Sequence, residues 1–117
     1  MRVVDRVLSL LLILGGVGHT LGSFKAYGAE PMMLLWSLCA GLFIFFYGAV
    51  NLVRAGRPED KALAWVCLLG GVGWIAASLR FGVLIGNVTD ARPMIFVVIT
   101  LGLCGMCLRT LLPRQQS

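Results

Sequence analysis

Four long runs of apolar residues, separated by short polar breaks, make up most of the chain. Their approximate limits are Val7–Phe24, Pro31–Val53, Ala62–Leu84 and Pro93–Leu112. A helix needs roughly 20 residues to cross a hydrocarbon layer of about 30 Å. Lipid offers no hydrogen-bond partner to an exposed backbone, so each run should be helical. The pattern therefore predicts four membrane-spanning helices, and the short breaks predict that successive helices are antiparallel.

The polar breaks carry residues that end and begin helices. Gly56 is followed closely by Pro58, and this pair should end the second helix. Asp5 and Asp60 each precede an apolar run, where a carboxylate can accept hydrogen bonds from free N–H groups. Pro31 and Pro93 are expected in the first turn of the second and fourth helices, because a missing N–H costs little there.

The sequence of the first span recurs later in the chain. Residues 5–25 can be laid over residues 60–80 without a gap, and about eight of the 21 aligned positions are identical. The Leu-Gly-Gly-Val-Gly sequence at 14–18 falls on the same sequence at 69–73. A match at a fixed spacing indicates an internal repeat. It also argues against a cleaved secretory signal at the N-terminus, because the matching copy lies in the middle of the chain.

The repeat predicts the architecture. We expect an all-α integral membrane four-helix bundle made of two tandem αα-hairpins, about 5–54 and about 60–112, in one domain spanning 1–117. Both copies run in the same direction, so the pseudo-twofold axis should lie along the membrane normal. Small residues four apart let helices approach closely in lipid, and the first and third spans are expected to cross at such residues. The predicted helix-packing residues are Gly15, Gly18, Gly22, Gly70, Gly73 and Ala77.

Composition supports a membrane location. Hydrophobic residues make up 59% of the chain and charged residues 13%, whereas soluble domains are about 45–50% apolar and about 25% charged. The net charge of +5 comes from basic residues spread over both sides, with no continuous basic face, so no nucleic-acid partner is expected. Seven basic residues lie on the side of the membrane that holds both termini and the central loop, and three lie on the other side. Because basic residues are enriched on the cytoplasmic side, this bias predicts a bacterial inner (plasma) membrane protein with both termini in the cytoplasm. The two sets are Arg2, Arg6, Arg54, Arg57, Lys61, Arg109 and Arg114, against Lys25, Arg80 and Arg92.

His19 is the only histidine, and it lies within the first span. A polar group at membrane depth is costly and suggests a function. The imidazole could bind a haem, a quinone or sterol oxygen, or a proton, or it could bond to a neighbouring helix and hold the packing. The equivalent position in the second copy is Trp74, which can donate one hydrogen bond but cannot ligate a metal. We predict a ligand site formed by His19, Trp74, Ser23 and Ser78, and no metal site.

All four cysteines lie in apolar runs. Cys104 and Cys107 form a CxxC, which resembles the motif of the four-helix vitamin K epoxide reductase and disulfide-forming families. That resemblance implies thiol redox chemistry near a quinone, but the cysteine pair that those families carry in an outer loop is absent here. Buried cysteine commonly serves as a small apolar filler, and the thiols Cys39 and Cys67 are too scattered to complete a structural zinc site.

Other polar side chains lie near helix ends. Tyr47, Asn51 and Arg54 recur on one face of the second span, and Arg54 is expected to extend toward the headgroups. No Asp or Glu lies deep inside a span, which disfavours a proton-coupled drug exporter. The sequence also lacks paired carboxylates, a Ser-His-Asp set and a nucleotide-binding loop.

The sequence thus indicates a small multi-pass membrane protein and favours a non-catalytic role over an enzymatic one. The leading hypothesis is a module that binds a lipophilic molecule such as a lipid or a quinone, or that joins a larger membrane complex, without a cofactor. One alternative is a homodimeric small transporter or channel. Another is a membrane redox protein that uses Cys104 and Cys107 or a haem.

The haem alternative can be tested directly. A haem with two histidine ligands needs a homodimer, because each chain has one histidine. We expect the purified protein to show no Soret band in its visible absorption spectrum. A Soret band that disappears in a His19→Ala variant would establish the haem alternative and overturn the leading hypothesis.

Overall fold

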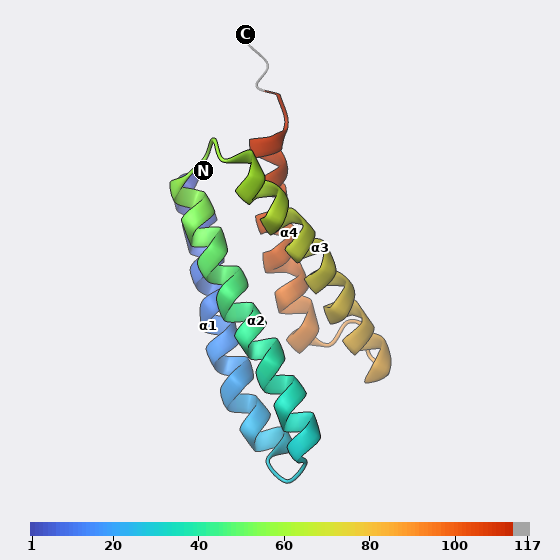
Figure 1. Cartoon of the computed structure of the whole chain (residues 1–117). Coiled ribbons are helices and arrows are strands. Elements are labelled where there is room, and N and C mark those ends of the chain that lie inside the picture. The colour runs from blue at the N-terminus through green and yellow to red at the C-terminus, as the bar shows by residue number, and fades with distance from the viewer. Residues whose placement is uncertain (114–117) are drawn as a thin grey trace.

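The computed structural model describes residues 1–113, and within this part the chain folds into four α-helices. Each helix is long and apolar enough to cross a membrane. Figure 1 shows them as two hairpins lying side by side, with the N-terminus and the α2–α3 connection at the same end. The predicted all-α bundle of four spans is therefore confirmed. The helices are α1 (Arg2–Tyr27), α2 (Pro31–Gly56), α3 (Lys61–Leu84) and α4 (Ala91–Leu111).

The helices extend beyond the apolar runs from which they were predicted. α1 begins at Arg2, five residues before its apolar run, and α2 continues to Gly56. The helices α1 and α2 have 26 residues each, about 39 Å at 1.5 Å per residue, which is more than the hydrocarbon thickness of about 30 Å. Charged residues do not stop a helix, so the outer turns continue into the headgroup region. Arg114 lies outside the described residues.

Most of the predicted helix-end signals are confirmed. The Asp60 carboxylate caps α3 by accepting a hydrogen bond from the backbone N of Leu63 at 2.9 Å. Pro31 is the first residue of α2 and Pro93 lies in the first turn of α4. Asp90 caps α4, and hydrogen bonds from the exposed Arg92 hold the pKa of the Asp90 carboxyl below its usual value.

Asp5 does not cap α1, and this part of the prediction is wrong. It lies inside the first turn, after the N-cap residue Met1, and its side chain is largely buried. The reason is that α1 starts earlier than its apolar run. Asp5 therefore points toward a neighbouring helix, where it meets a cation described below.

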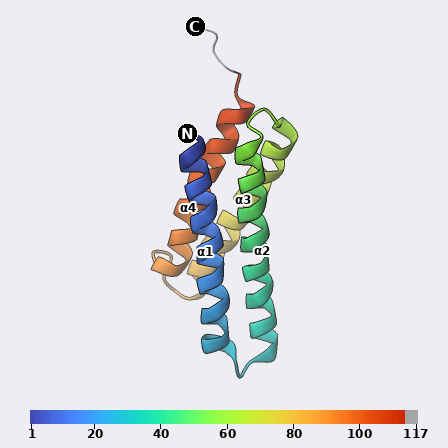
Figure 2. The same ribbon diagram turned by 90° about the vertical axis from the view of Figure 1, so that its left-hand side faces the viewer.

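The closest helix contacts lie within the hairpins, between α1 and α2 and between α3 and α4. Smaller contacts of α1 with α4 and of α2 with α3 join the two hairpins. Figures 1 and 2 together show that α1 and α3 run in the same direction, as predicted. They lie at diagonal corners of the bundle, however, so the predicted crossing of the first and third spans is wrong.

The glycines explain this arrangement. A Cβ added to Gly48 of α2 would lie 2.5 Å from Cγ1 of Ile13 and 3.2 Å from the carbonyl oxygen of Ser9, both on α1. A Cβ added to Gly16 of α1 would lie 2.9 Å from Cγ2 of Ile44 on α2. Close approach at glycines thus packs helices within a hairpin, and it also occurs between the hairpins, where Gly15 of α1 meets Phe96 of α4. By contrast, a Cβ at Gly18, Gly22 or Gly73 would meet nothing within 4 Å.

A small apolar core lies where the four helices meet. Leu12, Ile44, Tyr47 and Leu103 form this core, with one residue from α1, two from α2 and one from α4. Many other large apolar side chains are exposed, for example Leu14 at 65%. Exposure of this extent fits contact with lipid, where outward apolar surface carries no penalty. Partly buried side chains packed on this core are Leu8, Trp74, Phe96 and Ile99.

The glycine contacts lead to a paired prediction. Gly48→Ala should destabilise the bundle by about 1–3 kcal/mol, because the added methyl group overlaps Ile13 and approaches the backbone of α1. Gly18→Ala should leave stability unchanged, because its methyl group enters open space. Thermal unfolding of both variants in the same detergent measures the difference. Equal effects of the two substitutions would contradict this packing.

Candidate functional site

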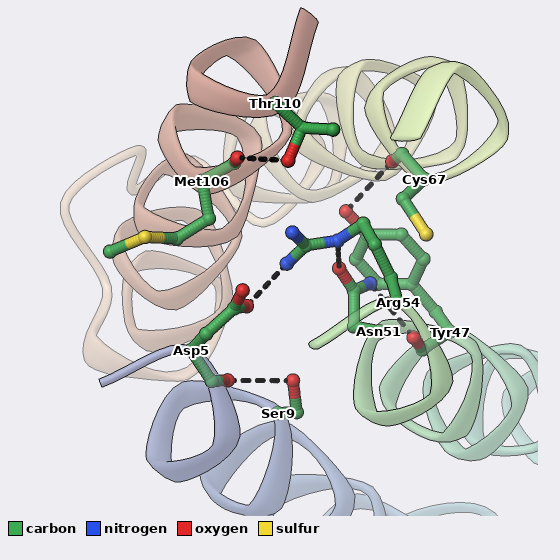
Figure 3. A network of polar contacts seen from close by, with 8 residues as sticks. All are labelled: Asp5, Ser9, Tyr47, Asn51, Arg54, Cys67, Met106 and Thr110. Carbon is green, nitrogen blue, oxygen red and sulfur yellow. Dashed lines mark hydrogen bonds and ion pairs between the residues drawn. The ribbon is translucent and has the colours of Figure 1, made fainter. Parts of the chain in front are cut away.

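The most extensive polar network lies at the end of the bundle that holds the N-terminus, and it centres on Arg54 (Figure 3). Only 2% of Arg54 is exposed. Its Nη2 atom forms an ion pair with the Asp5 carboxylate of α1. Its Nε atom donates to Oδ1 of Asn51 at 3.1 Å. A guanidinium of α2 is thus fixed from two directions inside the bundle.

The network continues from α2 to α3. The Asn51 side chain donates to the carbonyl oxygen of Tyr47 at 2.9 Å. The Tyr47 hydroxyl donates to the carbonyl oxygen of Cys67 on α3 at 3.0 Å. On the α1 side, the Ser9 hydroxyl donates to the carbonyl oxygen of Asp5 at 2.8 Å. Polar contacts of this kind are valuable in a low-dielectric interior, where an unpaired group would be costly.

The expectation that Arg54 extends toward the headgroups is therefore wrong. An exposed arginine at a helix end keeps its charge in water, but the early start of α1 places a carboxylate beside Arg54 in the interior. Pairing offsets much of the cost of removing both charges from water. A sequence signal existed, because Asp5 and Arg54 are opposite charges at the same end of two antiparallel helices.

Three of the four thiols lie close to this network. Cys67, Cys104 and Cys107 are buried, whereas Cys39 is exposed. No group of three metal-ligating side chains is found among residues 1–113. Both thiols of the Cys104–Cys107 motif are buried inside the bundle.

A hollow opens beside the ion pair, between the first turn of α1, the α2–α3 connection and the last turns of α4. We call it the terminal crevice, and its volume is about 830 Å³. This size is within the range of small-molecule sites, about 300–1,000 Å³. The charged side chains that line it are Arg2, Asp5, Arg54, Glu59, Lys61 and Arg109.

The predicted site residues lie nearer the other end. The His19 Nε2 atom is 2.9 Å from the carbonyl oxygen of Ser37 on α2. A carbonyl oxygen only accepts, so Nε2 carries a proton and donates this bond; in a neutral imidazole, Nδ1 is then an acceptor. Ser23 donates to the carbonyl oxygen of His19 at 2.7 Å and lies 2.6 Å from the Ser37 hydroxyl. His19 and Ser23 thus form one cluster, which joins α1 to α2.

Trp74 belongs to a neighbouring aromatic cluster. Its ring packs on Phe43 of α2 at a centroid distance of 5.2 Å and on Phe96 of α4 at 6.0 Å. Phe96 also meets the His19 ring edge to face at 6.3 Å. The two predicted halves of the site are therefore connected through Phe96, and His19 and Trp74 do not bond to each other.

The indole nitrogen of Trp74 is buried, and no hydrogen-bond acceptor reaches it within the described part of the chain. Beside the ring, Phe43, Leu69, Gly70, Gly73 and Trp74 line a shallow apolar groove of about 270 Å³.

The remaining predicted residues lie on different faces of the bundle. Ser78 is buried one turn beyond Trp74 on α3. Gly15 lies against Phe96, and Gly70 lies against the Tyr47 ring. Ala77, by contrast, is on the exposed face of α3.

The fold and these sites define a small multi-pass membrane protein with two polar clusters in its interior. Comparison of the chain with known protein families, with curated proteins and with solved structures gives no match. Its function therefore has to be argued from the geometry of its own residues.

The buried ion pair generates a second prediction. Arg54→Met should cost about 3–5 kcal/mol, because the Asp5 carboxylate would be left buried without a partner. Asp5→Leu should be similarly costly, whereas Asp5→Leu combined with Arg54→Met should recover most of the loss. Unfolding of the three variants in detergent gives the coupling between the two positions. The matched control is Arg57→Met, an exposed arginine in the next turn, and additive effects at Asp5 and Arg54 would contradict the pairing.

Proposed function

We propose that this membrane protein is a non-catalytic module that binds a lipophilic molecule such as a lipid, a quinone or an isoprenoid. The observation that supports this proposal is the buried indole N–H of Trp74, which has no acceptor among residues 1–113. The Trp74 side chain is also part of the lining of an apolar groove. An unsatisfied buried donor costs about 1–3 kcal/mol. A ligand oxygen that accepted this hydrogen bond would recover that cost.

The groove suits an apolar chain. Its lining side chains come from α2 and α3, the pair of neighbouring helices with the smallest contact. Two glycines, Gly70 and Gly73, keep one wall of the groove low. A hydrocarbon chain lying there would contact the Phe43 and Trp74 rings, while its carbonyl or hydroxyl group reached the indole nitrogen.

His19, Ser23 and Ser78 complete the proposed ligand-binding set. Nε2 of His19 is engaged by the Ser37 carbonyl, so this imidazole supports the packing of α1 on α2. The proposed role left to His19 is that of an acceptor at Nδ1 for a ligand hydroxyl. Trp74 then holds the ligand oxygen, and the cluster of His19 and Ser23 holds α1 and α2 in place around it.

We further propose that the protein lies in the bacterial inner membrane with both termini in the cytoplasm, and that its hairpins arose by tandem duplication. Without Arg54, which is paired with Asp5, six basic residues remain on the side of the termini and three on the other side, so the charge bias persists. Support for duplication comes from the sequence match and from the common direction of α1 and α3 (Figure 1).

A homodimeric transporter or channel is the second candidate. Gly18 and Gly22 lie on an open face of α1, where a second copy could approach closely. Flux in proteoliposomes that is lost in Gly18→Leu, a change pointing away from this chain's other helices, would favour this candidate over the first.

The binding proposal is tested at Trp74. Trp74→Phe keeps an aromatic ring but removes the N–H, so we expect about tenfold weaker retention of the ligand. The free protein should lose no stability through hydrogen bonding, because the indole N–H has no acceptor among residues 1–113. Mass spectrometry of lipids and quinones that copurify with the protein measures retention.

The matched control is Trp36→Phe, a tryptophan of α2 that is 66% exposed. It should retain the ligand as the parent protein does. Equal retention by both variants, or a parent protein that carries no lipophilic molecule, would contradict the proposal.

A further inference from the structure

We propose that the terminal crevice is a second binding site, independent of the groove at Trp74, and that it holds a phosphate group. The first argument is size and place. The crevice has a volume of about 830 Å³ and lies at the bundle end formed by the charged first turn of α1 and the loop between α2 and α3 (Figure 2). In a membrane-spanning bundle this end is at the level of the lipid headgroups.

The second argument is charge. Four cationic and two acidic side chains line the crevice. Asp5 is committed to Arg54, and its negative charge therefore offsets the buried arginine. The remaining charges, at the rim of the crevice, are three cations and one carboxylate, so positive charge is in excess. These residues are Arg2, Lys61, Arg109 and Glu59. A cleft lined mainly by one sign of charge concentrates ions of the opposite sign.

The third argument is the fixed guanidinium. Arginine carries five N–H donors, and the oxygens of Asn51 and Asp5 accept from Nε and Nη2 respectively. The guanidinium of Arg54, which is 2% exposed and belongs to the crevice lining, is thus held in one orientation, and its other N–H groups have no oxygen acceptor among the described residues. An oriented guanidinium suits phosphate because its planar fork matches the phosphate oxygens.

The fourth argument is the apolar wall. Met106 and Leu108 of α4, and Leu112 just after its end, line the same crevice. Leu108 and Leu112 are 46% and 63% exposed. This combination of cations and apolar side chains suits an amphiphile with a phosphate head. Free inorganic phosphate shares the head chemistry but does not use the wall.

The test compares three probes bound to purified protein in detergent: phosphatidic acid, diacylglycerol with the same acyl chains, and inorganic phosphate. We expect phosphatidic acid to bind, and diacylglycerol to bind at least about tenfold more weakly, because it lacks the charged head. Displacement of phosphatidic acid by millimolar inorganic phosphate would assign the site to the phosphate group alone. Failure to displace it would assign the site to the lipid. Equal binding of phosphatidic acid and diacylglycerol would overturn the proposal.

Rim variants locate the site. Lys61→Gln combined with Arg109→Gln should weaken phosphatidic acid binding about tenfold or more, and both side chains lie outside the buried network. The matched control is Arg57→Gln combined with Arg6→Gln, which removes two exposed cations that do not line the crevice. An equal loss in the two double variants would show binding to surface charge in general and would overturn the proposal.

Trp74→Phe serves as a separate control. It should leave phosphatidic acid binding unchanged, since Trp74 does not line the terminal crevice. A parallel loss at both sites would overturn the inference of two independent sites, whereas failure of the groove proposal alone would leave the crevice result standing.

Discussion

The ion pair between Asp5 and Arg54 is the interaction on which the polar interior of this bundle depends. In a membrane protein, apolar surface drives helix association only weakly, because lipid is as apolar as leucine. A buried carboxylate and guanidinium on neighbouring helices supply a specific and directional contact in its place. They fix the register of α1 against α2, and Arg54 also holds the Asn51 side chain, which donates to the carbonyl oxygen of Tyr47.

The two hairpins are held together differently from the helices within each hairpin. Inside a hairpin, glycines such as Gly48 admit a side chain of the partner helix directly against the backbone. Between hairpins, aromatic side chains carry the contact: Tyr47 reaches α3 with its hydroxyl, while Phe96 lies between His19 and Trp74. The aromatic interface leaves a groove on one side, and the ion pair leaves a crevice at one end. Both hollows therefore follow from how two similar hairpins meet.

The sequence pattern predicts the depth of the site residues in the membrane but not which neighbours they contact. The sequence singles out His19 as a polar group at membrane depth and Trp74 as its equivalent in the second copy, and the structure places both rings against Phe96. Arg54 was interpreted as a headgroup contact, since a charge near a helix end has water within reach. Its burial depends on where α1 begins and on which helix lies beside α2. Neither fact is visible in hydropathy alone, because hydropathy records the depth of a residue and not the face it occupies.

The sequence by itself determined the number of spans, their limits to within a few residues and the order of antiparallel helices, because a bilayer requires continuous apolar helices of a set length. It also located the cap at Asp60 and the proline at the start of α2, which depend on neighbouring residues only. The tertiary structure alone decided that α1 contacts α2 and α4 rather than α3, and that Asp5 meets Arg54. These contacts join residues far apart in the chain, and small-residue patterns occur on several faces at once. Only the packing of all four helices together selects which of those faces is buried.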